Sequence, residues 1–411
     1  MTILRSLGKQ IWTTALIASL VLAINGCTDA DHLKSNDKRI ENKIIPKSSD
    51  KIEPRALSDK DYRSLSQADD SRPASVMSIQ KPVRAIYVTS YVANGSRMGQ
   101  LIDLVNQTEL NAMVLDINSG ISLSSPVLTG KKKSYVMPVL SNKKSALRFR
   151  EVVKQLKKQN IYLIARIVTF KNPTLVYAKP EWALKKKNGK VWTDRNGTPW
   201  IDPYREEAWE YPLALAEMAA KIGFDEIQYD YVRFPENGSK VDREVAYANK
   251  SGWTKSEAIH KFLHRANLRA HKHGVKVSAD VFGMVGSSDD DMGIGQKWDS
   301  IVTEVDVISP MIYPSHYSEG MWGVNHPDLR PGAIVARALK DTVKHNQKLN
   351  EQGIATAKVR PWLQGFTAGW VHPHQKYGEA QIREQIVAAR KAGFNSYMIW
   401  NSANRYPKFT T

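Results

Sequence analysis

The strongest constraint on the fold is a regular alternation of two kinds of segment from Val83 onward. Short runs rich in β-branched and aromatic residues are separated by longer amphipathic stretches, which is typical of βα units and a parallel sheet. Strands are predicted at residues 83–90, 112–118, 161–170, 226–234, 275–282, 305–313, 358–366 and 395–401. Helices are predicted at residues 97–107, 145–158, 205–222, 255–273, 332–346 and 379–392, with a short one near 295–303.

Turn signals at the ends of the predicted helices support this assignment. Gly223, Gly274 and Gly393 each stand between a helical stretch and the next strand. Glycine readily takes the left-handed conformation that closes a helix C-terminus. Eight such units predict a fold of the α/β class, a single (β/α)8 TIM barrel over residues 81–411. A doubly wound open sheet is the alternative, but the regularity of the units favours closure.

The N-terminus has the pattern of an export signal. Within residues 1–26, two basic residues and no acidic residue precede an apolar run at 11–24, which is too short for a typical transmembrane helix. Cys27 is the only cysteine of the chain, and residues 22–27 resemble the lipobox of bacterial lipoproteins. We therefore predict that Cys27 is lipidated and anchors an exported protein to the cell envelope. Thr28 favours the outer membrane in a Gram-negative organism, and a cleaved signal with an incidental cysteine is the alternative.

Residues 27–80 differ in composition from the rest of the chain. They are rich in Asp, Lys, Ser and Pro, contain one aromatic residue (Tyr62) and show no sustained apolar period. Such a segment buries too little apolar surface to offset the entropy lost on ordering. We expect a flexible tether between the lipid anchor and the barrel.

The chain is strongly basic, with a formal net charge of +18 at pH 7. Such a charge attracts anionic partners, among them acidic polysaccharides. The basic residues are spread along the chain, however, and form tight clusters only at 131–133 and 185–187, which we expect in loops or at the barrel rim. No nucleic-acid-binding motif accompanies them, so we expect a polysaccharide partner, with anionic polysaccharides among the candidates, and no nucleic acid.

If the barrel closes, functional side chains belong at the C-terminal ends of its strands. Ionisable residues stand at the ends of the second to fifth predicted strands: Asp116, Arg166, Asp230 and Asp280. The predicted substrate-binding residues are Asp116, Arg166, Gln228, Arg233, Tyr313, Gln364, Trp400 and Asn401. Gln228 belongs to this set because strand alternation places it on the same face as Asp230. Asp225 and Asp306 stand at strand starts, and we assign them a structural role.

Carboxylates at a barrel mouth surrounded by aromatic residues suit glycosidic cleavage. One carboxyl group protonates the leaving oxygen, and the other attacks the anomeric carbon or activates water. Aromatic side chains expected in loops after the strands, where they would stack on sugar rings, are Trp192, Trp200, Trp298, Trp322, Trp370 and Tyr317. The structural alternative is that the aspartates cap loops and the tryptophans pack on the rim.

The run from Phe224 to Pro235, FDEIQYDYVRFP, resembles the hallmark of a bacterial family of glycoside-hydrolase-like barrels catalogued as a domain of unknown function. Residues 85–87, 278–283 and 309–314 support the resemblance, which extends over residues 82–407. The family is more distantly similar to α-amylase-like and α-galactosidase-like barrels, in which the aspartate of the fourth strand is the nucleophile.

The resemblance implies that Asp230 is the catalytic nucleophile and that Asp280 is the best candidate for the acid/base. Those relatives do not all take the acid/base from the fifth strand. Arg166 and Arg233 would hold Asp230 ionised or bind substrate hydroxyls, and Asp116 would bind a hydroxyl or share the acid role. Trp400 would form the floor of a sugar subsite.

The sequence does not fit family 18 chitinases, whose fourth strand carries Asp-Gly-x-Asp-x-Asp-x-Glu. When Asp225 and Asp230 are placed on that pattern, Gln228 takes the position of the middle aspartate and Val232 that of the catalytic glutamate. The proton donor is therefore missing. Substrate-assisted chemistry of the chitinase type is not expected.

The sequence predicts hydrolysis of an O-glycosidic bond in an envelope or extracellular polysaccharide, and two other classes remain open. The first is a non-catalytic, tethered polysaccharide-binding barrel. The second is a metal-dependent hydrolase, which would use His372, His374 and the acidic run 289–291 but lacks a third nearby histidine. No phosphate loop or dinucleotide fingerprint occurs, so no cofactor is expected. Sugar, linkage, stereochemical outcome and oligomeric state are not indicated.

Overall fold

The computed structural model describes residues 81–117 and 143–409. The predicted signal, the lipidation site Cys27, the tether and the lysine cluster at 131–133 lie outside these residues. No helix among the described residues is long and apolar enough to cross a membrane.

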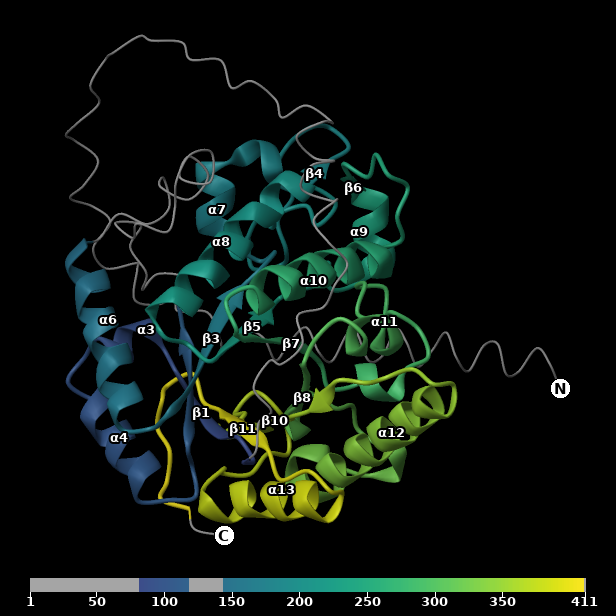
Figure 1. The fold of residues 1–411 in the computed structure, drawn as a ribbon. Coiled ribbons are helices and arrows are strands. Elements are labelled where there is room, and N and C mark those ends of the chain that lie inside the picture. Colours follow the sequence, from purple (N-terminus) through teal and green to yellow (C-terminus); the bar gives the residue numbers. More distant parts are fainter. Residues whose placement is uncertain (1–80, 118–142, 410–411) are drawn as a thin grey trace, which may run out of the picture.

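Eight parallel strands close into a barrel, and this confirms the predicted (β/α)8 fold (Figure 1). The strands are β1 (Arg84–Val88), β2 (Ala112–Asp116), β3 (Tyr162–Val168), β5 (Glu226–Asp230), β7 (Lys276–Phe282), β8 (Val307–Ile312), β10 (Trp362–Gln364) and β11 (Tyr397–Trp400). The circle closes because β11 pairs with β1 and β10 pairs with both β11 and β8. The predicted seventh strand is broken in two, and its first part, β9 (Lys358–Val359), pairs with β8.

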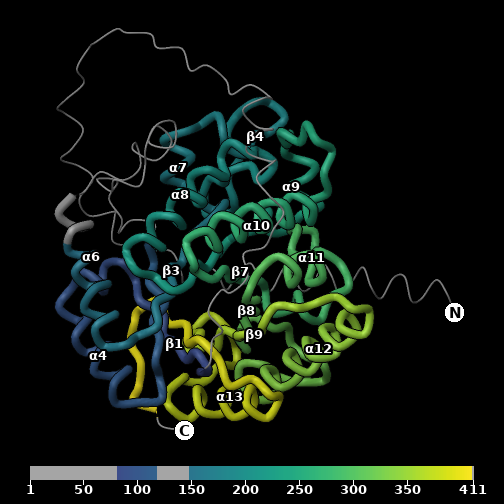
Figure 2. Tube along the Cα trace, viewed as in Figure 1, coloured from purple at the N-terminus to yellow at the C-terminus, as the bar shows by residue number. Residues whose placement is uncertain are grey.

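Helices surround the strands, and each predicted helix is present within a few residues of its expected bounds. They are α4 (Met98–Asn106), α6 (Lys143–Lys158), α8 (Glu206–Ile222), α10 (Lys255–His271), α11 (Trp298–Val302), α12 (Pro331–Glu351) and α13 (Glu379–Lys391). Gly223, Gly274 and Gly393 have φ of 110°, 70° and 92°, so the predicted left-handed turns are confirmed. Figure 2 shows the two ends of the described chain meeting, where β1 lies near the C-terminal segment.

Strand alternation divides the apolar residues into two clusters. Ala85 and Tyr87 of β1 belong to a small cluster shared by several strands, whereas Ile86 and Val88 belong to the large cluster that also contains the helices. The small cluster fills the barrel interior, and the large one packs strands against helices. This inward set determines which side chains reach the mouth of the barrel.

Short elements lie in the connections that follow the strands. They are α3 (Ser90–Ala93), α7 (Pro173–Ala178), α9 (Gly238–Glu244), the strands β4 (Lys185–Lys186) and β6 (Val245–Ala246), and the 3-10 helices η3 (Pro180–Trp182), η4 (Val285–Ser287), η5 (Pro314–His316), η6 (Met321–Gly323) and η7 (Pro327–Leu329). The antiparallel pair β4–β6 joins the connection after β3 to the connection after β5. The lysine cluster at 185–187, expected in a loop or at the rim, therefore begins in a short strand.

Asp225 and Asp306 lie at the amino-terminal end of the barrel, as predicted. Asp225 binds Lys157 Nζ at 2.6 Å and accepts a hydrogen bond from the Leu163 amide. Asp306 binds His271 Nε2 at 2.8 Å and accepts from the Val277 amide. Both carboxylates connect a strand start to a helix, which is a structural function.

Candidate active site

Four ionisable side chains lie at the carboxyl ends of adjacent strands. Asp116 of β2 is the register partner of Arg166 in β3, and Asp230 of β5 is the partner of Val168 in β3. Tyr229 pairs with Ala279 of β7, so Asp230 and Asp280 follow as neighbours on adjacent strands. Register neighbours in a sheet are about 4.8 Å apart. The barrel thus brings together the two carboxyl groups predicted to carry the chemistry.

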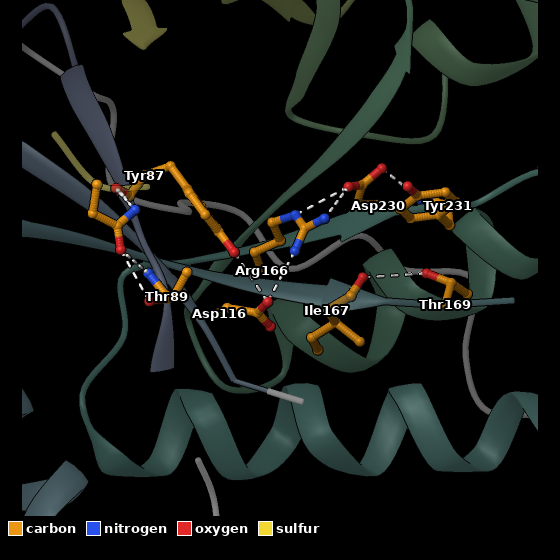
Figure 3. A network of polar contacts seen from close by, with 9 residues as sticks. Tyr87, Thr89, Asp116, Arg166, Ile167, Thr169, Asp230 and Tyr231 are labelled. Atoms are coloured by element: carbon orange, nitrogen blue, oxygen red, sulfur yellow. Dashed lines mark hydrogen bonds and ion pairs between the residues drawn. The ribbon is translucent and has the colours of Figure 1, made fainter. Parts of the chain in front are cut away.

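Asp230 is held through both of its oxygens (Figure 3). Arg166 donates to Oδ2 from Nε at 3.0 Å and from an Nη at 2.5 Å. The backbone amide of Tyr231 donates to Oδ1 at 2.6 Å. Tyr231 has a positive φ of 49°, an uncommon conformation for a residue other than glycine, directly after Asp230. Oδ1 accepts only one of these bonds and so retains a lone pair for a ligand.

Arg166 connects the acidic groups of the site. It binds Asp116 Oδ2 at 3.1 Å in addition to Asp230, and Tyr87 Oη donates to the same Asp116 oxygen at 3.2 Å. The guanidinium lies 5.4 Å from the ring centre of Tyr87 and 5.1 Å from that of Trp400. Burial alone would lower the pKa of Arg166, but Asp230 and Asp116 raise it well above its ordinary value. Arg166 is therefore a permanent cation that fixes Asp230.

Asp280 has a contrasting environment. Its side chain is buried, and Trp362 Nε1 donates to Oδ1 at 2.7 Å. Burial, and next the negative charge of Asp230, raise the pKa of the Asp280 carboxyl well above its ordinary value, although the bond from Trp362 opposes this shift. Asp280 thus tends to hold its proton, as a general acid must, whereas the neighbouring Asp230 is bound by a cation.

Both carboxyl groups line one pocket, and most of its other lining side chains are apolar or aromatic. It is lined by Arg166, Asp230, Tyr231, Arg233, Asp280, Phe282, Gly283, Met284, Met292, Met311, Tyr313, His316, Tyr317, Trp362 and Trp400. Gly283 is required by close packing, because a Cβ there would lie 2.5 Å from Tyr317 Oη and 2.6 Å from the Met311 carbonyl oxygen. The pocket thus combines a few charged groups with apolar and aromatic side chains, a lining typical of small-molecule sites.

The predicted substrate-binding residues divide into two groups. Arg166, Arg233, Tyr313 and Trp400 line the pocket, and Asp116 adjoins it through Arg166. Arg233 pairs with Glu236 at 2.6 Å, and its guanidinium lies 4.5 Å from the ring centre of Phe282. Glu236 thus neutralises the charge of Arg233. Of the two arginines, it is Arg166 that binds Asp230 directly.

Gln228, Gln364 and Asn401 do not line the pocket. Gln228 is buried, with Nε2 at 3.5 Å from Ser309 Oγ. Asn401 donates at 2.7 Å to the carbonyl oxygens of Gly365 and Arg405. Gln364 is fully bonded within the protein, as described below. Among the described residues these three side chains thus contact other parts of the protein and not the pocket, and their predicted role in substrate binding stays a prediction.

The expectation that loop tryptophans stack on sugars is wrong for the three that are buried. Their indole nitrogens donate within the protein: Trp192 to Glu244 at 2.9 Å, Trp200 to Asp194 at 3.1 Å, and Trp298, which starts α11, to Asn346 at 2.8 Å. Loops that pack on the barrel need apolar cores of their own, and large indoles supply them.

Three aromatic residues of that set remain near the pocket. Tyr317 lines it, and Trp322 packs on Tyr317 with ring centres 5.3 Å apart. Trp370 is 38% exposed and stacks on Phe366 at 6.0 Å. Phe366 in turn contacts Tyr313 of the pocket. Trp370 is thus the exposed ring of this set, connected to the pocket residue Tyr313 through Phe366.

Several residues of the pocket were not predicted from the sequence. Trp362 is two residues before Gln364 in the same strand, so strand alternation could have placed it on the inward face. His316 and Met292 lie outside the barrel strands, in η5 and in the connection between β7 and α11, where no periodicity applies. Neither residue type alone signals a pocket. Their positions depend on tertiary packing.

Among the described residues, no group of three or more His, Cys, Asp and Glu side chains is placed to hold a metal ion. His374 Nδ1 bonds the Val371 carbonyl oxygen at 2.8 Å, and its ring lies 5.7 Å from that of His372.

A family model described as "Putative glycosyl hydrolase domain" matches residues 85–406 of the chain. The chain belongs to this glycosyl hydrolase domain family. The match begins one residue inside β1 and ends past β11, and it confirms the resemblance seen in the sequence. No curated protein matches the sequence.

Solved structures of glycoside hydrolases share the fold. An endo-1,4-β-D-mannanase from Thermotoga petrophila is 13% identical, with a TM-score of 0.51, over 80% of this chain and 95% of the mannanase. The PgaB (BpsB) glycoside hydrolase domain from Bordetella bronchiseptica is 13% identical, with a TM-score of 0.50, over 78% of this chain and 94% of that domain. A hypothetical protein from Ruminiclostridium thermocellum is 31% identical, with a TM-score of 0.38. The comparison covers 51% of this chain and 98% of that protein.

Proposed function

We propose that this glycosyl hydrolase domain cleaves an O-glycosidic bond of an envelope or extracellular polysaccharide, with Asp230 and Asp280 as the catalytic pair. The observation that carries the proposal is the neighbouring position of these two carboxyl groups in one pocket with opposite environments. Asp230 is bound by Arg166, whereas Asp280 is buried with a raised pKa. These are the properties of a nucleophile and of a general acid.

In the proposed mechanism, Asp280 starts protonated. Trp362 occupies Oδ1, so the proton is on Oδ2 and passes to the glycosidic oxygen as its bond to the anomeric carbon breaks. Asp230 Oδ1 attacks the anomeric carbon and forms a glycosyl ester. Asp280, now a carboxylate, takes a proton from water, and the resulting hydroxide displaces Asp230. These steps need only the two carboxyl groups, the substrate and water.

The proposed glycosyl ester on Asp230 implies retention of configuration at the anomeric carbon, because two displacements occur at that carbon. Retaining enzymes hold their two carboxyl groups about 5–5.5 Å apart, and inverting ones roughly 6.5–9.5 Å. Asp230 and Asp280 directly follow a register pair on adjacent strands. Proton NMR of the first product anomer formed from an active substrate tests this assignment.

We place the enzyme outside the cytoplasm, anchored through lipidated Cys27 and separated from the membrane by residues 27–80. The signal-like composition of residues 1–26 and the single cysteine at their end support this part of the proposal. A tethered barrel would reach a polymer near the membrane. Palmitate labelling of the wild-type chain and of Cys27→Ser tests the anchor.

A non-catalytic glycan-binding barrel is the second candidate, and one observation favours it. Arg166 occupies Oδ2 of Asp230, and Tyr231 binds Oδ1, so both oxygens already have partners. A carboxylate held in this way can bind a sugar hydroxyl without attacking it. The experiment below separates the two functions.

The decisive experiment measures release of reducing ends by residues 28–411 from a panel of bacterial envelope and extracellular polysaccharides. The variants are Asp230→Asn and Asp280→Asn, and the matched control is Asp289→Asn, an exposed aspartate outside the pocket. Loss of general acid catalysis costs about 10²- to 10⁴-fold in rate. We expect product from wild type and the control, and at least this loss in both pocket variants. Unchanged release in the pocket variants contradicts the catalytic assignment, whereas binding without release supports the second candidate.

A further inference from the structure

His316 is a pocket residue to which the mechanism above gives no role. It ends η5, directly after β8, and lines the pocket with Tyr313, whose ring centre is 5.3 Å away. Its Nδ1 lies 3.0 Å from Ser315 Oγ. Whether Nδ1 donates or accepts in this contact decides what the other nitrogen, Nε2, can offer to a ligand.

The side-chain amide of Gln364 has only one possible orientation. Its Oε1 accepts from the backbone amide of Ser315 at 3.0 Å, and its Nε2 donates to the Phe366 carbonyl oxygen at 3.0 Å and to Asp328 Oδ1 at 3.1 Å. A backbone amide only donates and a carbonyl oxygen only accepts. Exchanging the two ends of the Gln364 amide would place donor against donor and acceptor against acceptor.

This orientation determines the direction of the Ser315 hydroxyl. Ser315 Oγ lies 2.9 Å from Gln364 Oε1, which has no proton to give. The single hydroxyl proton of Ser315 therefore points to Gln364. Towards His316, Ser315 Oγ can then only accept, so Nδ1 of His316 carries the ring proton.

The other nitrogen of the ring, Nε2, makes no hydrogen bond within the described part of the chain. Burial lowers the pKa of His316 to about 4, so the ring is neutral at pH 7. In a neutral ring protonated at Nδ1, Nε2 carries a lone pair.

From these contacts we infer that His316 is a specificity-determining residue, whose Nε2 accepts a hydrogen bond from a free hydroxyl of the bound sugar. The inference rests on the proposed function and narrows its substrate class. A carboxylate, sulfate or ester oxygen at this sugar position would only accept hydrogen bonds and would meet the Nε2 lone pair. The sugar in this subsite is therefore neutral and unesterified at that position, despite the net charge of +18 on the chain.

The first test needs no substrate. Two-bond ¹H–¹⁵N NMR spectra of residues 28–411 labelled at histidine distinguish a protonated ring nitrogen from an unprotonated one, and His316→Asn assigns the signals. At pH 7 we expect a neutral His316 ring with the proton on Nδ1. A ring protonated on Nε2, or on both nitrogens, overturns the inference even if the enzyme is active.

A pair of serine variants tests the chain of bonds that sets the proton position. Ser315→Ala removes the acceptor for Nδ1, and we expect a mixture of the two neutral forms of His316. Ser318→Ala is the matched control, because the buried Ser318 hydroxyl makes no hydrogen bond within the described residues. This control leaves the His316 spectrum unchanged. An unchanged spectrum in Ser315→Ala contradicts the inferred chain.

The third test uses a glycan that wild type cleaves. In His316→Asn the side-chain amide can still reach Ser315 but not the Nε2 position, whereas in His316→Gln a carbonyl oxygen can reach it. Loss of one neutral hydrogen bond weakens binding by about 3- to 10-fold. We expect KM to rise by this factor in His316→Asn, with kcat less affected and with partial rescue in His316→Gln. Equal KM in wild type and both variants overturns the inference, whereas absence of cleavage by wild type refutes the proposed function and leaves the NMR result standing.

Discussion

The two ends of the barrel differ in the partners that they give to a buried carboxyl group. At the amino-terminal end, Glu226 pairs with Arg360 and accepts from Tyr162 Oη at 3.1 Å, in a site from which solvent is excluded. At the carboxyl end, Asp280 is equally buried, yet no cation lies within ion-pair distance of it in residues 81–117 and 143–409. The amino-terminal end pairs its buried acid with a cation, whereas the carboxyl end leaves Asp280 without a counter-ion, which agrees with the role of acid proposed for it.

The largest expected effect comes from breaking the amino-terminal ion pair. Glu226→Gln leaves the Arg360 guanidinium buried without a counter-charge, which costs about 3–5 kcal/mol of unfolding free energy. Urea unfolding followed by fluorescence measures this loss. Asp225→Asn is the control at the same end, because its pair with Lys157 is partly exposed and contributes about 0–1 kcal/mol. Equal losses in the two variants would remove the distinction between buried and exposed pairs.

The second prediction concerns the pH dependence of stability at the carboxyl end. Because the pKa of Asp280 is raised on folding, its protonated form favours the native state at low pH, and this contribution is lost as pH rises from the unfolded pKa to the folded one. Asp280→Asn removes the titration. The unfolding free energy of the variant relative to wild type should therefore increase with pH by up to about 1.4 kcal/mol per pH unit in that range.

The measurement is denaturant unfolding of both proteins from pH 4 to pH 8. A difference that does not vary with pH would show that the folded structure does not perturb Asp280, and its assignment as the acid would lose its support. A difference that falls with pH would show that the pKa is lowered, as in a paired carboxylate.

The third prediction tests the packing behind the carboxyl end. In Gly283→Ala the new methyl group would lie 2.5 Å from Tyr317 Oη and 2.6 Å from the Met311 carbonyl oxygen, so the wall of the pocket must shift. Overpacking of this kind costs about 1–3 kcal/mol. Thermal unfolding reports the loss, and kcat/KM should fall with it. Gly369→Ala, where a methyl group meets open space, is the control and should leave both values unchanged.

The smallest expected effect belongs to the rim. Trp370→Ala removes an exposed ring that stacks on Phe366 and should raise KM for a polymer by about 3- to 10-fold, from the roughly 0.5–1.5 kcal/mol of an aromatic contact. Kinetics on long and short oligosaccharides of one glycan check this. A single-unit substrate confined to the pocket should show no change. Equal effects on both lengths would place Trp370 within the pocket rather than at its rim.

The fold could be predicted because its signals are local. The two periodicities separate strands from helices, and glycines such as Gly223 mark their boundaries, so each βα unit is readable without its neighbours. The neighbouring position of Asp230 and Asp280 followed from the order of the strands, since consecutive βα units place their strands side by side wherever the loops lie. Both inferences depend on the barrel strands and helices and not on the connections between them.

The remaining features depend on contacts between segments distant in sequence. Gln364 ends a strand as Asp230 does, but Ser315 and Asp328 use its amide completely. Trp200 follows a strand in a loop, but the loop folds over it. No pattern in the sequence distinguishes a strand-end amide that meets a ligand from one that meets another loop. The proton position on His316 is harder still to predict, because it depends on the contacts of Gln364 with Asp328 and with Ser315 and then on the contact of Ser315 with His316.

The barrel has few backbone hydrogen bonds between β8 and β10, because the seventh strand is interrupted. β10 pairs with β8 through only two register pairs, Trp362 with Met311 and Leu363 with Ile312, whereas β2 and β3 share five. Segments held by few backbone bonds open at lower free energy than the whole domain. Trp362 belongs to this short pairing and also donates a hydrogen bond to Asp280. Local opening of this pairing would therefore disturb Asp280, the proposed acid. On warming, the proposed activity should be lost at a lower temperature than that of global unfolding.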